Sequence, residues 1–361
     1  MTDAGRLRAR LAAARADRPL PGISLVWALA VAVFVVVAAL LGLAFGPVSL
    51  GAGRVTREVL SHVPLLGVES SLTETEKAIL WELRAPRVAL GLVVGALLAS
   101  AGAAYQGVFR NPLADPYLLG AAAGAGLGAT LVIAYDVGDP LGVDLRPVAA
   151  FAGALLGVAA AYALGRSVGG GRSTATLILA GVTVAAFLTA VQTFVQQRNA
   201  DTVQEVYAWI LGQLETSGWR EVLIALPYAV VSTALLLWHR RLLDVLAVGD
   251  DEAASLGVAV ARVRLVVVAA ATLGTAAAVA FSGLIAFVGI IVPHAIRLLV
   301  GTSYRAVLPL SLGVGAGFLV LTDLICRTAI APAELPIGVV TAFLGAPFFA
   351  VILRTTRTVG P

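Results

Sequence analysis

Charged side chains are scarce in this chain of 361 residues, since only 13% of them are Asp, Glu, Lys or Arg. Soluble globular domains carry about 25%. Apolar residues make up 59% of the chain, so most side chains must face lipid or other helices, which excludes an ordinary soluble domain. The length would suit two soluble domains, but in a membrane it suits one bundle of many spanning helices.

Lysine, cysteine and histidine are also nearly missing. The one lysine, Lys77, stands between Glu76 and Ala78, whereas a phosphate-binding P-loop needs Gly-Lys-Ser/Thr. Cys326 has no second cysteine for a disulfide, and the three histidines lack metal-ligand spacing. No nucleophile and base are grouped in the sequence. We therefore expect no enzymatic activity, no ATP hydrolysis, no resident cofactor and no metal site in this chain.

Acidic side chains are missing from the middle of the apolar runs. Asp323 stands toward the end of its run, four residues before Arg327, which favours a local i,i+4 ion pair. Carriers driven by ions or protons usually hold functional carboxylates at mid-membrane. The pattern therefore favours a transport subunit that a partner energises. A passive channel or a secondary carrier for a small solute is the alternative, and a membrane enzyme is disfavoured because polar clusters are lacking.

What the chain has in abundance is long apolar runs, which predict an all-α, polytopic membrane protein with about ten transmembrane helices. The transmembrane domain is expected to cover 23–354. Residues 1–22 form a basic N-terminal tail, because the apolar run after them is too long for a signal peptide, and 355–361 form a C-terminal tail. The expected spans are 23–46, 86–108, 116–135, 146–166, 174–196, 219–238, 262–281, 284–300, 306–326 and 337–354.

Charges in the connections predict the orientation of these spans. With the N-terminus in the cytoplasm, 16 of the 25 basic residues but only seven of the 21 acidic residues fall on the cytoplasmic side. Short cytoplasmic loops are enriched in Arg and Lys. We therefore expect a multi-pass protein with both termini in the cytoplasm.

Two connections are expected to hold short helices. The outer connection 47–84 contains R-V-T-R-E-V-L-S-H, which suits an interfacial helix. The cytoplasmic connection 239–261 contains L-A-V-G-D-D-E-A-A-S-L-G-V, with acidic residues at a helix start and Gly257 as its stop. This second segment predicts a helix lying on the cytoplasmic face. Glycines four residues apart, such as Gly91 and Gly95, favour close helix packing.

Six motifs, in order along the chain, are similar to those of one known family: the permease subunits of type II ABC importers for iron chelates, haem and vitamin B12. The resemblance covers nearly the whole chain after about residue 23. It implies the type II ABC importer permease fold for the ten-helix domain. The motifs are L-R-A-P-R (83–87), G-A-x-x-A-S-A-G (95–102), Q-G-V-F-R-N-P-L-A-D-P (106–116), L-x-L-A-G-V (177–182), S-G-L-I-A-F-V-G-I-I-V-P-H-x-x-R (282–297) and E-L-P-I-G-V-V-T-A-F-L-G-A-P-F-F (334–349).

The resemblance also implies partners and a mechanism. Two copies would form a homodimer around a central path in the cytoplasmic membrane of a bacterium. Two ATPase subunits, which use ATP and Mg, would dock on the cytoplasmic face, and a solute-binding protein would dock outside. The cargo would be a metal chelate: a ferric siderophore, haem or cobalamin. Import would proceed by alternating access, with no covalent chemistry on the cargo.

The resemblance leads to four expected sites. The residues expected to contact the binding protein are Arg84, Arg87 and Arg327. The ATPase-coupling element, about 248–260, would act through Asp250, Asp251, Glu252, Ala254, Leu256 and Gly257. The cytoplasmic gate corresponds to Ser173, Thr174 and Ala175, which stand just before the L-x-L-A-G-V motif. The translocation path is expected along the fifth span and its neighbours, including Thr183, Gln192 and Gln196. Two simpler interpretations stay open: arginines at a span end can snorkel, and a polar residue in a span can bond a neighbouring helix.

Overall fold

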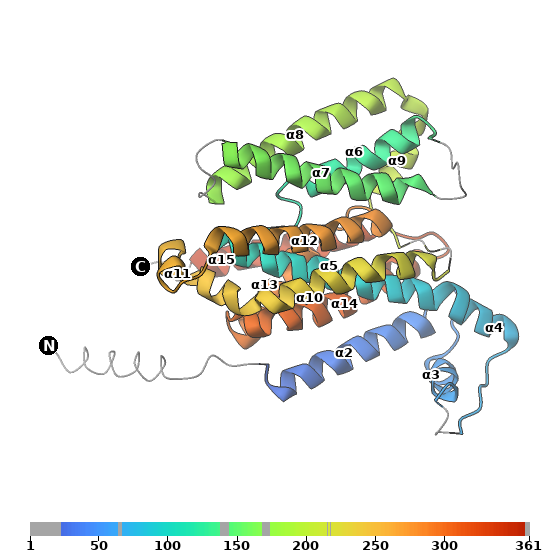
Figure 1. Cartoon of the computed structure of the whole chain (residues 1–361). Coiled ribbons are helices and arrows are strands. Elements are labelled where there is room, and N and C mark those ends of the chain that lie inside the picture. Colours follow the sequence, from blue (N-terminus) through green and yellow to red (C-terminus); the bar gives the residue numbers. More distant parts are fainter. Residues whose placement is uncertain are drawn as a thin grey trace, which may run out of the picture.

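The computed structural model describes residues 23–63, 67–137, 144–167, 174–214, 216 and 218–357. Over these ranges the chain is helical and contains no strand (Figure 1), which confirms the all-α class. The elements are α2 (Leu25–Ala44), α3 (Ala52–Ser61), α4 (Glu74–Ala78), η1 (Ile79–Arg84), α5 (Ala85–Phe109), α6 (Ala121–Ala134), α7 (Leu145–Ser167), α8 (Thr174–Arg198), η2 (Ala200–Thr202), α9 (Val203–Ile210), α10 (Arg220–Val248), α11 (Asp250–Ser255), α12 (Val260–Ser282), α13 (Val288–Val300), α14 (Tyr304–Thr328) and α15 (Ile337–Arg357).

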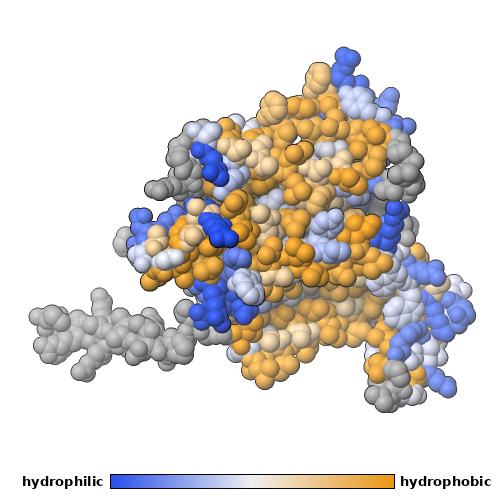
Figure 2. Space-filling model, in the orientation of Figure 1, coloured by the Kyte–Doolittle hydropathy of each residue, from blue (hydrophilic) through white to orange (hydrophobic). Residues whose placement is uncertain are grey.

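Each of the ten positions predicted for a span holds an apolar helix. Among the described residues, seven helices are long and apolar enough to cross a membrane, namely α2, α5, α7, α8, α10, α12 and α14. Three shorter apolar helices lie in α6, α13 and α15. Hydrophilic residues gather at the two ends of the bundle, and the surface between the ends is largely apolar (Figure 2). This distribution is that of a multi-pass membrane protein.

The helices are arranged in layers (Figure 1). One layer holds α6, α7 and α8, a central group holds α5, α10, α12, α13 and α14, and α2 packs on the far side of α14. The short helices α3 and α4 lie at one end of the bundle and α11 lies at the other (Figure 1). We call these the α3 end and the α11 end. Both short helices predicted in the connections, α3 and α11, are therefore present.

Close backbone contacts between glycines hold neighbouring helices of the same layer together. A Cβ atom on Gly95 of α5 would collide with the carbonyl group of Gly315 in α14, and one on Gly124 of α6 would collide with the carbonyl group of Gly153 in α7. Only glycine permits helix backbones to approach this closely. The central helix α5 is buried along almost its whole length as a result.

Two expected spans, 116–135 and 284–300, are shorter than predicted. The helices α6 and α13 that replace them begin at Ala121 and Val288, preceded by non-helical segments. Tyr117 bridges these two segments: its hydroxyl donates to the Ile285 carbonyl and accepts from the Ile285 N–H, both at 3.1 Å. Irregular backbone at membrane depth requires such burial within protein. The boundary predicted between the spans 262–281 and 284–300 is confirmed, since α12 ends at Ser282.

The helix predicted to end at 238 is longer than predicted. The observed α10 continues to Val248, so the connection 239–261 is largely helix. Leu243 and Leu246 in this extension are buried against the central helices. The polar residues His239 and Arg240 suggested that the helix ends before them. The packing of the two leucines keeps the chain helical beyond this point.

Candidate functional site

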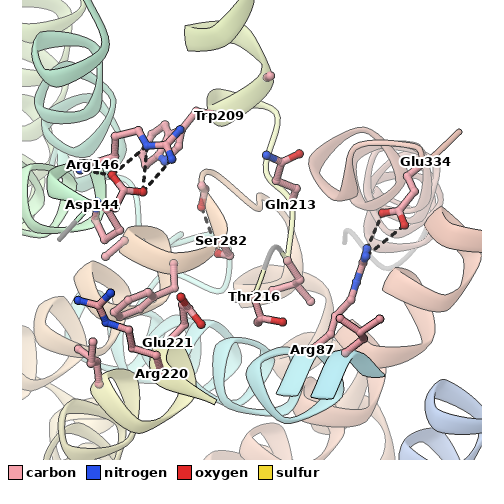
Figure 3. A pocket seen from close by; sticks show the side chains of 18 of the residues that line it. Arg87, Asp144, Arg146, Trp209, Gln213, Thr216, Arg220, Glu221, Ser282 and Glu334 are labelled. Atoms are coloured by element: carbon pink, nitrogen blue, oxygen red, sulfur yellow. Dashed lines mark hydrogen bonds and ion pairs between the residues drawn. The ribbon is translucent and has the colours of Figure 1, made fainter. Parts of the chain in front are cut away.

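The three arginines predicted for docking meet at the α3 end of the bundle. Arg84 ends η1, Arg87 lies in the first turn of α5, and Arg327 lies in the last turn of α14. All three line one cavity of about 880 Å³, and Figure 3 shows Arg87 on its wall. Arg327 is far from Arg84 and Arg87 in the sequence, and the packing of α14 on α5 brings it next to them. We call the three residues the arginine cluster.

Arg84 is buried, and its guanidinium is occupied by main-chain oxygens. It donates to the carbonyl groups of Leu43 at 3.0 Å and Ala44 at 3.1 Å, and also to that of Val48. The last carbonyl groups of a helix have no partner within the helix. Arg84 therefore caps the end of α2, a structural role that the sequence did not signal because its partners are distant main-chain atoms.

Arg327 is buried next to the same helix end. Its guanidinium donates to the Gly42 carbonyl at 3.2 Å. Its Nε lies 2.9 Å from Asp323 Oδ2, so the predicted i,i+4 ion pair is present. Arg327 and Arg84 together fasten α2 to α14 and α5.

Arg87 is the member of the cluster that reaches an exposed partner. It donates to Asp323 Oδ1 at 2.8 and 3.1 Å, and to both oxygens of Glu334 at 2.6 and 3.1 Å. The Asp323 side chain is 2% exposed and that of Glu334 is 42% exposed. An exposed ion pair contributes only about 0–1 kcal/mol. Glu334 is therefore exchangeable for another carboxylate, whereas Asp323 is a fixed partner.

Residues that the sequence did not assign form the opposite wall of the cavity (Figure 3). Arg146 pairs with Asp144 at 2.8 Å and with Glu205 at 3.4 Å. Burial opposes ionisation of Asp144, but hydrogen bonds from Arg146 hold the pKa of this carboxyl below its usual range. Gln213 and Thr216 line the space between the two walls. Arg146 is the first residue of the predicted span 146–166, and Asp144 precedes this span. Their position at the start of the span is the sequence signal that places them at the α3 end.

Ion pairs fix the short helix α11 at the opposite end. Asp250, its first residue, lies 2.9 Å from the buried Arg264 of α12 and 3.5 Å from Arg110. Arg110 ends α5 in the left-handed conformation, with φ 49°. Asp250 therefore ties α11 to both α12 and the end of α5. Among the residues predicted for coupling, Asp250 is the one that forms ion pairs with other helices of the chain.

The other residues predicted for coupling form an exposed surface. They are Asp251, Glu252, Ala254, Leu256 and Gly257. Leu256 is 70% exposed and follows the last residue of α11. The Gly257 N–H donates to the Ala254 carbonyl at 2.9 Å, and the Val258 N–H donates to the Ala253 carbonyl at 3.1 Å. With φ +81° at Gly257, this is a Schellman motif, so the predicted glycine stop is confirmed.

The residues predicted for the gate and the path are less tightly grouped. Ser173 and the side chain of Thr174 lie outside the described residues, and Ala175 is exposed at the start of α8. Gln192 is buried and donates to the Thr130 hydroxyl of α6 at 3.1 Å. It therefore bonds a neighbouring helix, the simpler of the two interpretations.

The exposed face of α8 carries a second set of polar and small residues. Thr183 is exposed, its hydroxyl bonded within the helix to the Leu179 carbonyl at 2.9 Å. Gln196, also predicted for the path, is half-buried one position before the exposed Gln197. Spacings of three and four residues place a stripe of exposed residues on one side of α8. The stripe is Thr183, Ala186, Ala190, Thr193 and Gln197.

Comparison with known proteins adds three findings. The sequence profile of the FecCD transport family matches residues 33–355. An uncharacterized ABC transporter permease protein of Bacillus subtilis is 41% identical over 321 residues, covering 89% of this chain and 91% of the relative. The cobalamin import system permease protein of Halobacterium salinarum is 42% identical over 287 residues, covering 80% and 76%.

The structural comparison agrees with the sequence comparison. A solved structure, described as an inward-facing conformation of a metal-chelate type ABC transporter, superposes with a TM-score of 0.77 at 28% identity. The match covers 91% of this chain and 98% of that chain. The arginine cluster and α11 both lie within the matched family region.

Proposed function

Because the chain belongs to the FecCD transport family, it is a transmembrane permease subunit of an ATP-driven importer, and we propose that its cargo is a metal chelate. The observation that carries this proposal is the family match over residues 33–355. The names of the cobalamin permease and of the metal-chelate transporter support the cargo class. Permeases of this family are transport subunits and not enzymes. A ferric siderophore, haem and cobalamin are the cargoes to be compared.

The partners follow from the family. An ABC permease works with an ATPase and a substrate-binding protein. We propose a homodimer of this chain, with two ATPase subunits at the α11 end that bind ATP and Mg, and one binding protein at the α3 end. The membrane is then the cytoplasmic membrane of a bacterium, with the α11 end and both termini in the cytoplasm. The basic bias of the connections at the α11 end supports this orientation.

Binding-protein docking is assigned to the α3 end, with Arg87 as the contact. A carboxylate of the binding protein would replace Glu334 on the Arg87 guanidinium, because Glu334 is the more exposed of its two partners. Arg84 and Arg327 lie behind it, and they maintain positive charge while holding α2 in place. Such charge complementarity chiefly affects orientation and association rate.

ATPase coupling is assigned to α11. Leu256 would enter an apolar groove on the ATPase, with Asp251 and Glu252 beside it, since all three are exposed. Asp250 would transmit the movement, because its pairs with Arg264 and Arg110 join α11 to α12 and α5. A rigid connection of this kind is the physical requirement for coupling two distant sites.

The path is assigned to the exposed face of α8 at a dimer interface. The stripe that begins at Thr183 supports this assignment, because small and polar side chains suit a wet path. Leu179 and Phe187, which flank the stripe and are highly exposed, would pack against the second copy. The gate at residues 173–175 would close the cytoplasmic end of this path. ATP binding and hydrolysis in the partner would then rock the two copies between outward and inward openings.

A transport assay with a panel of cargoes tests this proposal. The chain is reconstituted in vesicles with its cognate ATPase and binding protein, and uptake of radiolabelled ferric hydroxamate, haemin and cobalamin is measured. We expect uptake of one of these chelates, saturable and dependent on the binding protein. Uptake of none of them, in vesicles where the ATPase turns over and the binding protein docks, would contradict the cargo class.

A further inference from the structure

An apolar crevice of about 600 Å³ separates α7 from α12. Leu155, Val158 and Tyr162 of α7 form one wall, and Leu265 and Val268 of α12 form the other. The crevice therefore lies between the layer of α6, α7 and α8 and the central group of helices. The surface over these two helices is apolar, with hydrophilic residues at its α11 end (Figure 2).

The crevice is as deep as one leaflet of a bilayer. Its deep end is near Thr272, whose hydroxyl is bonded to that of Tyr105 at 2.7 Å and so offers no free polar group. Between Leu155 and Arg166, which both line the crevice, α7 rises about 16 Å at about 1.5 Å per residue. The hydrocarbon core of a bilayer is about 30 Å thick. The crevice thus extends from the α11-end surface of the membrane to its middle.

Two arginines stand at the mouth of the crevice. Arg166 lies in the last turn of α7 and lines the crevice. Arg262 lies in the first turn of α12, three residues before Leu265, and so on the same side of that helix. Both arginines are exposed, and neither has an ion-pair partner among the residues that the structure describes. Because α7 and α12 run in opposite directions, both positive charges lie at headgroup depth.

We propose that this crevice binds an anionic phospholipid from the leaflet at the α11 end. One acyl chain lies between α7 and α12, and the phosphate lies between Arg166 and Arg262. An almost wholly apolar lining favours a hydrocarbon chain over a polar solute. Basic pockets between membrane helices are suited to anionic headgroups. The bound lipid would join the two layers of the bundle, and the proposal does not depend on the cargo or on the partner subunits.

Native mass spectrometry of the purified full chain in detergent tests this site. The probes are phosphatidylglycerol and phosphatidylcholine with identical acyl chains. We expect the wild-type chain to bind phosphatidylglycerol roughly 10-fold more tightly. Replacing both arginines, Arg166→Gln with Arg262→Gln, should remove that preference and leave phosphatidylcholine binding unchanged. The control is Arg240→Gln with Arg241→Gln, which removes the same charge from α10 at the same end and should retain the preference.

A second variant tests the acyl-chain position. Ala159→Trp fills the crevice and should weaken binding of both lipids, whereas Leu156→Trp, on the exposed side of α7, should not. Thermal unfolding of each variant confirms that it is folded. The proposal would be overturned if the Arg240/Arg241 control variant lost the preference for phosphatidylglycerol as fully as the Arg166/Arg262 variant. It would also be overturned if Ala159→Trp bound both lipids as tightly as the wild-type chain. Cross-linking of Ala159→Cys to a second copy of the chain would also overturn it, because the crevice would then be a subunit contact.

Discussion

At the scale of single residues, the arginine cluster combines fixed and exchangeable contacts. Arg84 and Arg327 are bonded to main-chain carbonyl groups at the end of α2, which gives both of them a structural role. Arg87 shares the buried Asp323 with Arg327 and has the exposed Glu334 as its second partner. The three arginines therefore have different roles, although all of them stand near the ends of predicted spans.

The structural role of Arg84 is testable by stability. Arg84→Ala leaves carbonyl groups at the end of α2 without donors, and each such buried group costs about 1–3 kcal/mol. We expect the thermal unfolding temperature of the detergent-solubilised chain to fall by several degrees. Arg57→Ala, at an exposed position on α3, serves as the control and should change little. Equal unfolding temperatures for the two variants would show that Arg84 does not cap α2.

The exchangeable contact predicts opposite effects at two neighbouring residues. Arg87→Gln removes the proposed docking charge and should weaken binding of the binding protein. Glu334→Gln removes its competitor on Arg87 and should strengthen that binding, by roughly 2- to 5-fold for an exposed pair. Surface plasmon resonance on the permease in nanodiscs measures both affinities. Weaker binding in Glu334→Gln would mean that Glu334 itself contacts the partner.

At the scale of elements, α5 links the two proposed docking surfaces. It begins beside Arg84 and Arg87 and ends at Arg110, which lies 3.5 Å from Asp250 of α11. Its long buried stretch and its backbone contact with α14 at Gly95 make it a rigid element. We therefore expect α5 to transmit a movement from one end to the other.

The attachment of α11 to this element depends on Asp250. Asp250→Asn removes the charge that Arg264 and Arg110 bind, so α11 should loosen. Hydrogen exchange of amides in 250–257 should become at least several-fold faster, and stimulation of the partner ATPase by the binding protein should fall. Asp251→Asn, with an exposed carboxylate on the same helix, is the matched control. Exchange as slow as in the wild type would contradict this role for Asp250.

The close contact between α5 and α14 predicts a large effect of side-chain size. Gly95→Leu would place a side chain against the backbone of Gly315, so we expect loss of about 3 kcal/mol or more, or failure to fold. A Cβ atom at Gly53 in α3 meets no atom within 4 Å, so Gly53→Leu is the control. The yield of monodisperse protein by size-exclusion chromatography measures the difference. A normal yield of Gly95→Leu would show that the two helices are less closely packed.

At the scale of the whole molecule, hydropathy predicted the positions of all ten apolar helices, because burial in lipid or among helices dominates this composition. Helix α11 could be predicted from its own residues, because the motif that ends it at Gly257 involves only residues close to it in the sequence. Distant contacts could not be predicted in the same way. The shortening of α13 depends on Ile285 meeting Tyr117, and the capping by Arg84 depends on where α2 ends. Such contacts depend on the fold, and no spacing of residues in the sequence indicates them.

The central claim is that this permease transports only when a partner supplies energy. The most direct measurement is uptake of its chelate into vesicles that contain the chain with or without the ATPase, each with and without ATP and Mg, and with the loaded binding protein outside. We predict accumulation against a gradient only when the ATPase, ATP and Mg are all present. Equal flux in vesicles that lack the ATPase, or that lack ATP, would contradict the account and identify a channel or a secondary carrier.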